Sequence, residues 1–187
     1  MNTDTSIPMS AETAQELVRR SLALWGMSDS NFTMMRHNEN LACQVEDGSE
    51  GRYLLRICQP RTTALAGEQQ GVAAIESEIA WLSAVRKDTG LLLQEPVASI
   101  RGRYIESVDH PDGKRSIPVL LLTWIDGEML TQKEPEAEQL LAEVGRVQRR
   151  VHEQARSWII PKGFRRPLYD ESALHPPSLT RSAPTSS

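Results

Sequence analysis

Residues 31–58 read NFTMMRHNENLACQVEDGSEGRYLLRIC, and this stretch decides the fold. Apolar side chains recur at every second position in three successive runs, which are interrupted by residues 38–40 and 47–51. Period-two alternation is typical of half-buried strands, and Asn, Asp and Gly are favoured in turns. The stretch therefore predicts three short antiparallel strands in a meander. The alternating positions are Phe32 and Met34, then Leu41, Cys43 and Val45, then Tyr53, Leu55 and Ile57.

Helical periodicity flanks these strands. Residues 11–25 carry apolar side chains at helical spacing, with Ser10 as the expected N-cap and Gly26 as the expected C′ residue. A second helix is expected over residues 72–86, ending near Gly90. A third is expected from Pro135, in its first turn, to about residue 155.

Further strands are expected between the second and third helices. Residues 96–100 and 103–108 are half-buried candidates, and residues 117–125 are nearly all apolar. This last run is short, which favours a central strand over a helix. Asp126-Gly127 closes it.

Composition indicates a soluble globular protein. Of 187 residues, 39% are apolar and 25% are charged, and the net charge of −4 gives no general attraction to nucleic acid or membrane surfaces. The sequence has no apolar run long enough to span a membrane and no signal-peptide pattern at its start. Cys43 and Cys58 lie in apolar stretches and are expected to be small buried residues in a reducing compartment. We therefore expect a cytoplasmic location.

The order of these elements is that of a kinase-like small lobe, and five local sequences resemble the aminoglycoside phosphotransferase, choline kinase and type II homoserine kinase family. The resemblance covers roughly Leu17 to Leu174. It is carried by residues 37–45, Tyr53-Leu54-Leu55-Arg56-Ile57, residues 75–82, residues 121–128, and residues 145–152 with Trp158 and 163–167.

The resemblance implies an α+β fold. Residues 11–127 would form a protein-kinase-like nucleotide-binding lobe, an antiparallel sheet of about five strands with a packed helix. Residues 128–174 would begin an incomplete C-lobe with its first helix. Residues 1–10 are expected to be flexible. Residues 175–187 are rich in Pro, Ser and Thr, which predicts disorder.

Arg56 is the first candidate for nucleotide binding. The resemblance places it where most kinases have a lysine that contacts the phosphates and is held by a carboxylate. Alternation along the strand puts Arg56 on one face with Leu54 and Cys58, the face that would line the cleft. The alternative is a surface arginine on an edge strand.

Glu78 is the expected partner of Arg56. Successive helix residues step by about 100°, so Glu76 and Glu78 point in different directions, and Glu78 falls within the apolar face of the helix. A carboxylate in an apolar face needs a partner because burying it alone is costly. The alternative is a surface ion pair with Arg86 or Lys87.

Two further segments complete the expected ATP site. The resemblance implies that the amides and side chains of Asn38, Glu39 and Asn40 cap a phosphate, and that backbone groups of Thr123 and Ile125 meet the adenine edge, with Trp124 between them. Alternatively, the first segment is an ordinary turn and the second an ordinary buried strand.

The residues for the chemical step are missing. The family's second lobe has a His-Gly-Asp catalytic loop and a later magnesium-binding Asp, but His-Gly-Asp occurs nowhere in these 187 residues. We therefore assign no catalytic residue and no metal ligand, although an intact member would use magnesium with ATP. The change of composition at His175 suggests a frameshifted or prematurely ended reading frame.

The expected function is a member of this ATP-dependent family that binds nucleotide and lacks the catalytic lobe. A small-molecule hydroxyl acceptor would bind only if a C-lobe is supplied. The alternatives are a non-catalytic nucleotide-binding or partner-binding fragment and a non-functional truncated product. The third helix predicts self-association through an exposed apolar face made of Leu140, Leu141, Val144 and Val151.

Overall fold

A computed structural model of the chain describes residues 10–37, 40–48, 51–58, 71–111, 113–127 and 137–166. The expected tail at residues 175–187 and nearly all of the expected N-terminal extension lie outside these residues. The elements run in the order α1 (Ala11–Ala23), β1 (Asn31–His37), β2 (Asn40–Asp47), β3 (Gly51–Cys58), α3 (Val72–Thr89), β4 (Pro96–Val97), β5 (Glu106–Asp109), β6 (Ser116–Thr123) and α4 (Ala137–Ser157).

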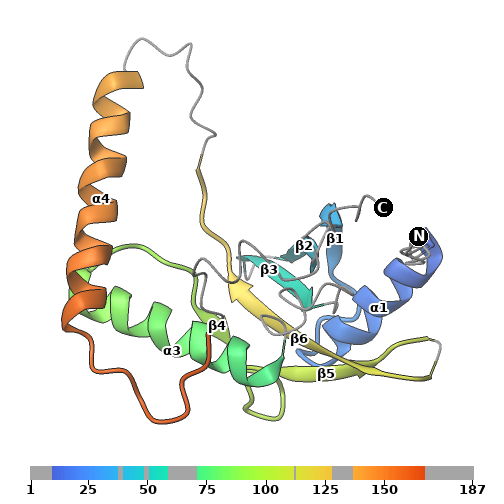
Figure 1. The fold of residues 1–187 in the computed structure, drawn as a ribbon. Coiled ribbons are helices and arrows are strands. Elements are labelled where there is room, and N and C mark those ends of the chain that lie inside the picture. Colours follow the sequence, from blue (N-terminus) through green and yellow to red (C-terminus); the bar gives the residue numbers. More distant parts are fainter. Residues whose placement is uncertain are drawn as a thin grey trace, which may run out of the picture.

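The strands form one antiparallel sheet at the centre of the molecule (Figure 1). In the described part of the chain the sheet has six strands in the order β1-β2-β3-β6-β4, and β5 also pairs with β6. The predicted β1-β2-β3 meander is confirmed, and so is the central position of β6, which lies between β3 and β4. The α+β fold class expected from the sequence is confirmed, with one strand more than the expected five.

The strands β4 and β5 are shorter than expected. A turn around Ser99 separates them, in which the N–H of Gly102 donates to the Ser99 carbonyl at 2.8 Å and the N–H of Ser99 donates to the Arg103 carbonyl at 2.8 Å. Gly102 has a φ of +74°, a conformation that glycine adopts without steric cost. The turn takes these backbone groups out of the sheet, so residues 98–105 do not continue either strand.

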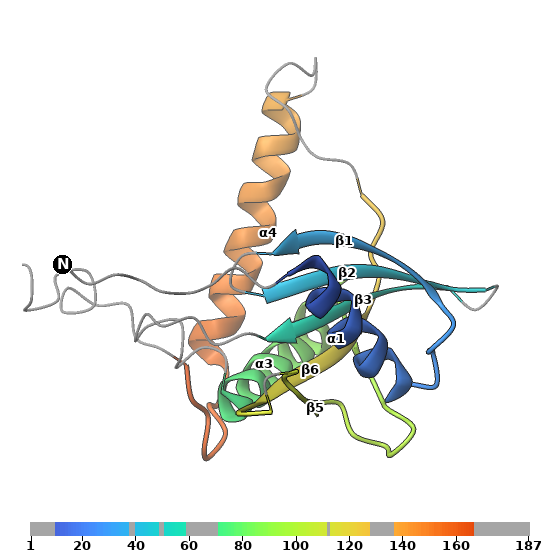
Figure 2. The same cartoon turned by 90° about the vertical axis from the view of Figure 1, so that its right-hand side faces the viewer.

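Alternation along the strands gives the sheet two faces, and a helix covers each (Figure 2). The helix α1 packs against one face through the main apolar core. The helix α3 packs against the other face, where Ile75 meets Cys58, Leu120 and Leu122. The main core consists of Ala14, Leu17, Val18, Leu22, Trp25, Leu41, Cys43, Val45, Leu55, Ile57, Val108, Ile117, Val119 and Leu121.

The helix α1 begins as predicted and ends slightly earlier than expected. The Ser10 side chain accepts a hydrogen bond from the N–H of Thr13 at 3.1 Å, which confirms the N-cap. The C-cap is Leu24, so Gly26 follows two residues later in a turn, with a φ of +74°. The Trp25 indole N–H donates to the Val97 carbonyl at 2.9 Å and ties the end of α1 to β4.

The predicted end of the helix α3 near Gly90 is confirmed, three residues beyond the expected segment 72–86. It ends at Thr89, and Gly90 forms the C-cap in the left-handed conformation, with a φ of +66°. The Gly90 N–H donates to the Arg86 carbonyl at 2.8 Å. This glycine cap is the αL ending that helices commonly use.

The helix α4 stands away from the sheet, with its C-terminal end beside α3 (Figures 1 and 2). Pro135, its expected first turn, lies outside the described residues. Leu140, Leu141 and Val144 are exposed, as predicted. Val151 is half-buried, so the stripe is shorter than expected, because α4 turns this end towards α3. Within the described residues, no helix has both the length and the apolar character needed to cross a membrane.

Candidate functional site

The predicted contact between Arg56 and Glu78 is present. The Arg56 Nη1 donates to Glu78 Oε1 at 2.7 Å, and its Nη2 donates to Oε2 at 3.1 Å. A planar guanidinium matches a planar carboxylate in this two-point geometry. The pair joins β3 to α3, and neither side chain is an isolated surface charge, since their exposed fractions are 19% and 23%. The alternative partners Arg86 and Lys87 are therefore excluded as the main contact, and Arg86 instead contacts Glu95 at 2.7 Å.

The Arg56 guanidinium is a fixed positive charge. Burial by itself lowers the pKa of Arg56, but hydrogen bonding to Glu78 and the negative charge of that carboxylate raise it overall above the ordinary value. Its Nε is buried and has no hydrogen-bond partner among the described residues. A buried donor without an acceptor is costly.

The surface beside this pair is an open floor formed by β2 and β3. Arg56 is paired with Ala42 across these strands, and Leu54 with Gln44. The side chains of Ala42, Gln44 and Leu54 are half-buried, whereas Leu41, Cys43, Val45 and Leu55 on the opposite face are buried. The helix α3 covers only part of this face, which leaves the small side chain of Ala42 beside the arginine. The sequence analysis did not single out Ala42 or Gln44, although alternation counted from Arg56 marks both.

The segment 123–125 lies at the end of β6, on the side away from Arg56. Arg56 pairs with Leu120, so Trp124 lies four residues, or about 13 Å, farther along the strand. The N–H of Thr123 donates to the Glu95 carbonyl at 2.8 Å, and that of Trp124 to the Arg52 carbonyl at 3.2 Å. These two donors are therefore engaged in the sheet. Ile125 is the first residue past this strand pairing.

The expected phosphate-capping turn is only partly described. Asn38 and Glu39 lie outside the described residues. Asn40 begins β2, opposite Cys58 at the end of β3, so it lies at the same end of the sheet as Arg56. Its side-chain Oδ1 is buried and has no partner within the described part of the chain.

Three surface hollows lie away from this face. One is between α1 and β1, another is between the C-terminal half of α3 and the segment that leads to β4, and the third is around residues 26–31 and 46–48. The first is lined by Glu12 and Glu16 as well as Arg19. Two carboxylates make it unfavourable for an anion, because like charges repel. The floor beside Arg56 has the cation that an anion requires.

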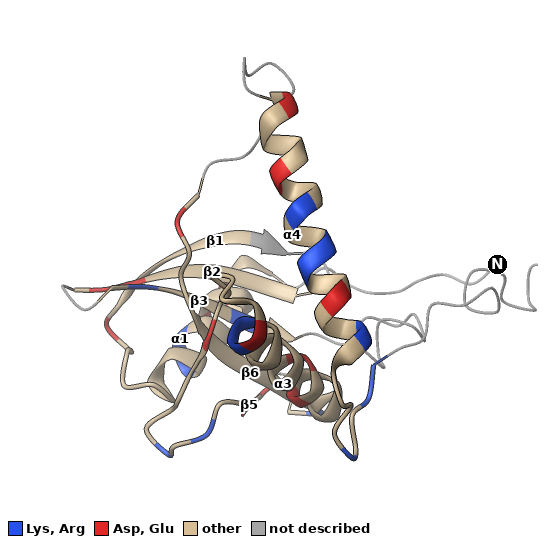
Figure 3. Cartoon of the chain, turned by 90° about the vertical axis from the view of Figure 1, so that its left-hand side faces the viewer, with Lys and Arg blue, Asp and Glu red and all other residues tan. Residues whose placement is uncertain are grey.

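Metal binding finds no support in the described residues. Among them, no group of three or more His, Cys, Asp or Glu side chains is placed to hold a metal ion. The described residues therefore offer no site for the magnesium that the resemblance implies, and we derive no step through it. Acidic and basic side chains are spread over α3 and α4 without a cluster of acids (Figure 3).

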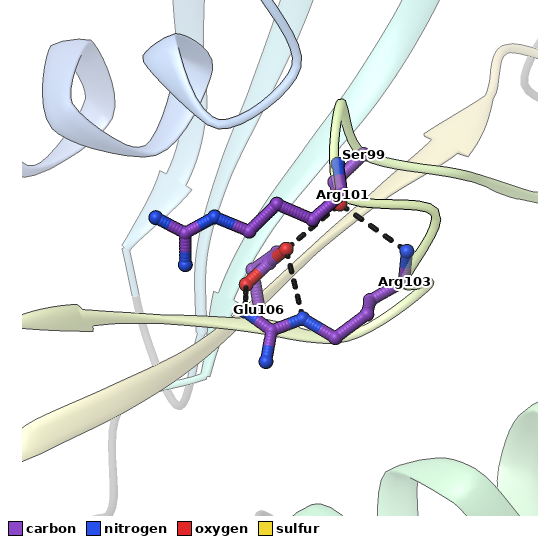
Figure 4. Close-up of polar contacts among 4 residues, drawn as sticks. All are labelled: Ser99, Arg101, Arg103 and Glu106. Atoms are coloured by element: carbon purple, nitrogen blue, oxygen red, sulfur yellow. Dashed lines mark hydrogen bonds and ion pairs between the residues drawn. The ribbon is translucent and has the colours of Figure 1, made fainter.

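Glu106 is a buried carboxylate with a structural role (Figure 4). Its Oε1 accepts from Ser99 Oγ at 2.7 Å and from Arg103 Nε at 3.1 Å, and its Oε2 pairs with Arg103 Nη2. Burial by itself raises the pKa of Glu106, but the hydrogen bonds from Arg103 and Ser99 and the charges of Arg103 and Arg101 lower it overall. Because its own loop supplies these partners, Glu106 fixes the turn between β4 and β5.

A sheet with α3 packed on one face, and a strand cation paired to a helix carboxylate, define a kinase-like small lobe. The sequence model of the phosphotransferase enzyme family matches residues 36–183, which is most of the chain. The chain belongs to this family, as the resemblance implied. The matched stretch continues beyond Leu174, where we expected the resemblance to end.

Three solved structures with a similar fold are named as kinases or phosphotransferases. The chain is 23% identical to a microcompartment-associated aminopropanol kinase, with a TM-score of 0.68 over 84% of this chain and 46% of that one. It is 19% identical to an amicoumacin kinase in complex with AMP-PNP, Ca²⁺ and Ami, with a TM-score of 0.69 over 94% of this chain and 49% of that one. It is 13% identical to a spectinomycin phosphotransferase in complex with ADP and spectinomycin, with a TM-score of 0.50 over 79% of this chain and 39% of that one.

The chain therefore spans about half the length of these kinases or less. At these identities the likeness concerns the fold alone. A search of curated proteins finds no match to this chain.

Proposed function

We propose that this chain binds ATP on the α3 face of its sheet, as the nucleotide-binding part of a small-molecule phosphotransferase. The observation that carries the proposal is the two-point pair between Arg56 and Glu78 beside an open floor. Membership of the phosphotransferase enzyme family supports it, because phosphoryl transfer depends on positioned phosphates and neutralised charge.

The phosphates would lie at the Arg56 end of the floor. Glu78 holds the Nη atoms of Arg56, and the side chain keeps an exposed fraction of 19%, so its guanidinium would offer a fixed positive charge to the phosphate oxygens. Asn40 lies at the same end of β2 and β3. Asn38 and Glu39, which precede Asn40 in the predicted phosphate-capping turn, would also bind the phosphates.

The base would lie at the opposite end of the same floor. Leu54 offers apolar contact with a flat ring, and the segment after β6 offers backbone groups at its edge. Since the N–H groups of Thr123 and Trp124 are already engaged, we assign the backbone donor for the base to Ile125. The carbonyl groups of this segment would be its acceptors. About 13 Å along the strand separates this end from Arg56, which suits an extended nucleotide.

The family-level activity is transfer of phosphate from ATP to the hydroxyl group of a small molecule, and we propose it for the protein in which this lobe works, in the cytoplasm. The similar structures include kinases of aminopropanol and amicoumacin. We assign no residue of this chain to the chemical step or to metal binding. Our proposal for these 187 residues is therefore confined to nucleotide binding.

Thermal unfolding of the purified chain with and without ATP tests this proposal. ATP should raise the melting temperature, because a ligand that binds only the folded state stabilises it. Arg56→Ala should abolish the increase, whereas Arg149→Ala should preserve it. Arg149 is the matched control because it has the same charge and forms an exposed pair with Glu153 on α4. An equal increase in Arg56→Ala and the wild type would contradict the assigned site.

A further inference from the structure

Segments that follow the sheet in sequence hold α3 at two places. Near its start, Ser77 and Glu78 contact Arg165 and Arg166, which follow α4. At its end, Asp88 and Thr89 contact side chains of α4 itself. About eleven residues, or roughly 16 Å of helix, separate the two places. Two contacts this far apart resist tilting of α3 as well as sliding.

The contact near the start of α3 reaches the functional pair itself. The Arg165 N–H donates to Ser77 Oγ at 2.8 Å, although 88 positions separate these residues in sequence. Ser77 is buried, and its hydroxyl also donates to the Ala73 carbonyl at 2.7 Å. Next to it, Arg166 Nη1 lies 3.6 Å from Glu78 Oε2, the oxygen that accepts from Arg56 Nη2. One carboxylate therefore faces two guanidinium groups.

The contact at the C-terminal end of α3 holds the C-terminal half of α4 in place. Gln154 Nε2 donates to Asp88 Oδ2 at 3.0 Å, and Gln154 is buried. Arg150 Nη2 donates to the Thr89 carbonyl. The turn that follows α4 is closed by an edge-to-face contact between Trp158 and Phe164, with ring centroids 5.1 Å apart. This turn returns the chain from α4 to the start of α3.

We propose that Arg166 is a positioning residue for the phosphates of ATP, acting through Glu78. Arg166 attracts the Glu78 carboxylate towards residues 161–166 while the Arg165 contact anchors the adjacent helix turn. Glu78 is thereby held in the orientation that engages both Nη atoms of Arg56, which keeps the guanidinium charge in place for the phosphates. This proposal rests on the proposed function, since it concerns the orientation of the arginine that would bind the phosphates.

The geometry favours a role in positioning over a role in stability alone. The Arg166 side chain is 40% exposed, and a single pair of this kind contributes little to folding. Glu78 is only 23% exposed, so water screens its interactions with the two guanidinium groups only weakly, and these charge interactions are stronger than at an exposed site. Loss of Arg166 should therefore alter phosphate binding more than it alters the free energy of unfolding.

Two measurements on the full chain test this proposal. The first is calorimetric affinity for ATP and for adenosine, which lacks the phosphates. Arg166→Ala should weaken ATP binding by about two- to fivefold and leave adenosine binding unchanged, since an exposed ion pair has this magnitude. Arg166→Lys should recover part of the loss, because it keeps the charge. Arg149→Ala, the charge-matched control on α4, should bind both ligands as the wild type does.

The second measurement is hydrogen exchange of the α3 amides in the absence of ligand. Exchange over residues 74–82 should be faster in Arg166→Ala than in the wild type, and unchanged in Arg149→Ala. Unchanged exchange together with an unchanged ratio of ATP to adenosine affinity would overturn the proposal. If the wild type binds no ATP, the proposed function fails. In that case hydrogen exchange alone tests whether Arg166 positions α3, and unchanged exchange would refute this positioning role as well.

Discussion

Arg56 on β3 and Glu78 on α3 meet in a two-point pair, with Nη1 to Oε1 at 2.7 Å and Nη2 to Oε2 at 3.1 Å. Only 22 positions separate them in sequence, but they come from a strand and from a helix packed on it. The pair fixes α3 relative to the sheet and aims a permanent positive charge along the open floor.

Replacing the carboxylate tests the pair directly. Glu78→Gln keeps the size of the side chain but removes the charge that holds Arg56, so it should lower the free energy of unfolding by about 1–3 kcal/mol. Urea denaturation measures this change. Glu76→Gln is the matched control, because Glu76 lies two residues away on α3, is exposed, and should change stability by less than about 0.5 kcal/mol when replaced. Equal effects of both substitutions would contradict the structural role of Glu78.

Glu106 predicts a specific dependence of stability on pH. Its pKa is lowered in the folded chain, so the unfolded state binds the proton more tightly and the stabilisation is fully present above the ordinary glutamate pKa of about 4.3. The stabilisation is lost as the pH falls through the lowered folded value. Glu106→Gln should therefore cost about 1–3 kcal/mol near neutral pH. The difference between wild type and variant should shrink below pH 4 in denaturant titrations, and a constant difference would contradict this account.

Both cysteines should be unreactive in the folded chain. Cys43 is fully buried, and burial raises the pKa of its thiol to about 11. Burial also raises the pKa of Cys58, although Arg56 opposes this. A thiol-specific chromogenic reagent at pH 8 should therefore label neither cysteine within minutes and both after unfolding, because only the thiolate reacts. Rapid labelling of the native chain would show that one of the cores is open.

The exposed stripe on α4 predicts self-association at high concentration. Leu140, Leu141 and Val144 are exposed along one side of the helix. Sedimentation velocity should show a concentration-dependent increase in mass for the wild type, reduced by Leu141→Glu. Gln139→Glu adds the same charge on a different side of α4 and should leave the association unchanged. A monomeric wild type at all concentrations would refute this prediction.

Local patterns predicted the elements that local interactions determine. Alternation in residues 31–58 gave the three strands, and the apolar run after residue 116 gave the central strand β6. The resemblance implied a helix carboxylate as the partner of Arg56, and the apolar face of the helix selected Glu78 over Glu76, because a carboxylate in that face needs a cation. The role of these residues in binding nucleotide stays a prediction.

Long-range contacts were not predictable from these patterns. Arg165 reaches Ser77 across 88 positions, and no periodicity in either segment marks the other. The short length of β4 and β5 depends on the turn around Ser99 and on the buried carboxylate of Glu106. In sequence, that glutamate reads as an ordinary polar position of a half-buried strand. Its partners become visible only when the loop is folded.

The most direct test of the central claim is to map ATP binding by amide chemical shifts of the isotope-labelled chain. The account predicts that ATP shifts the amides of Asn40, Arg56, Glu78 and Ile125 together, and that adenosine shifts Ile125 while leaving Arg56 nearly unchanged. Amides beside the hollow between α1 and β1, such as those of Glu16 and Asn31, should not move. Shifts confined to that hollow, or no shifts at millimolar ATP, would contradict the account.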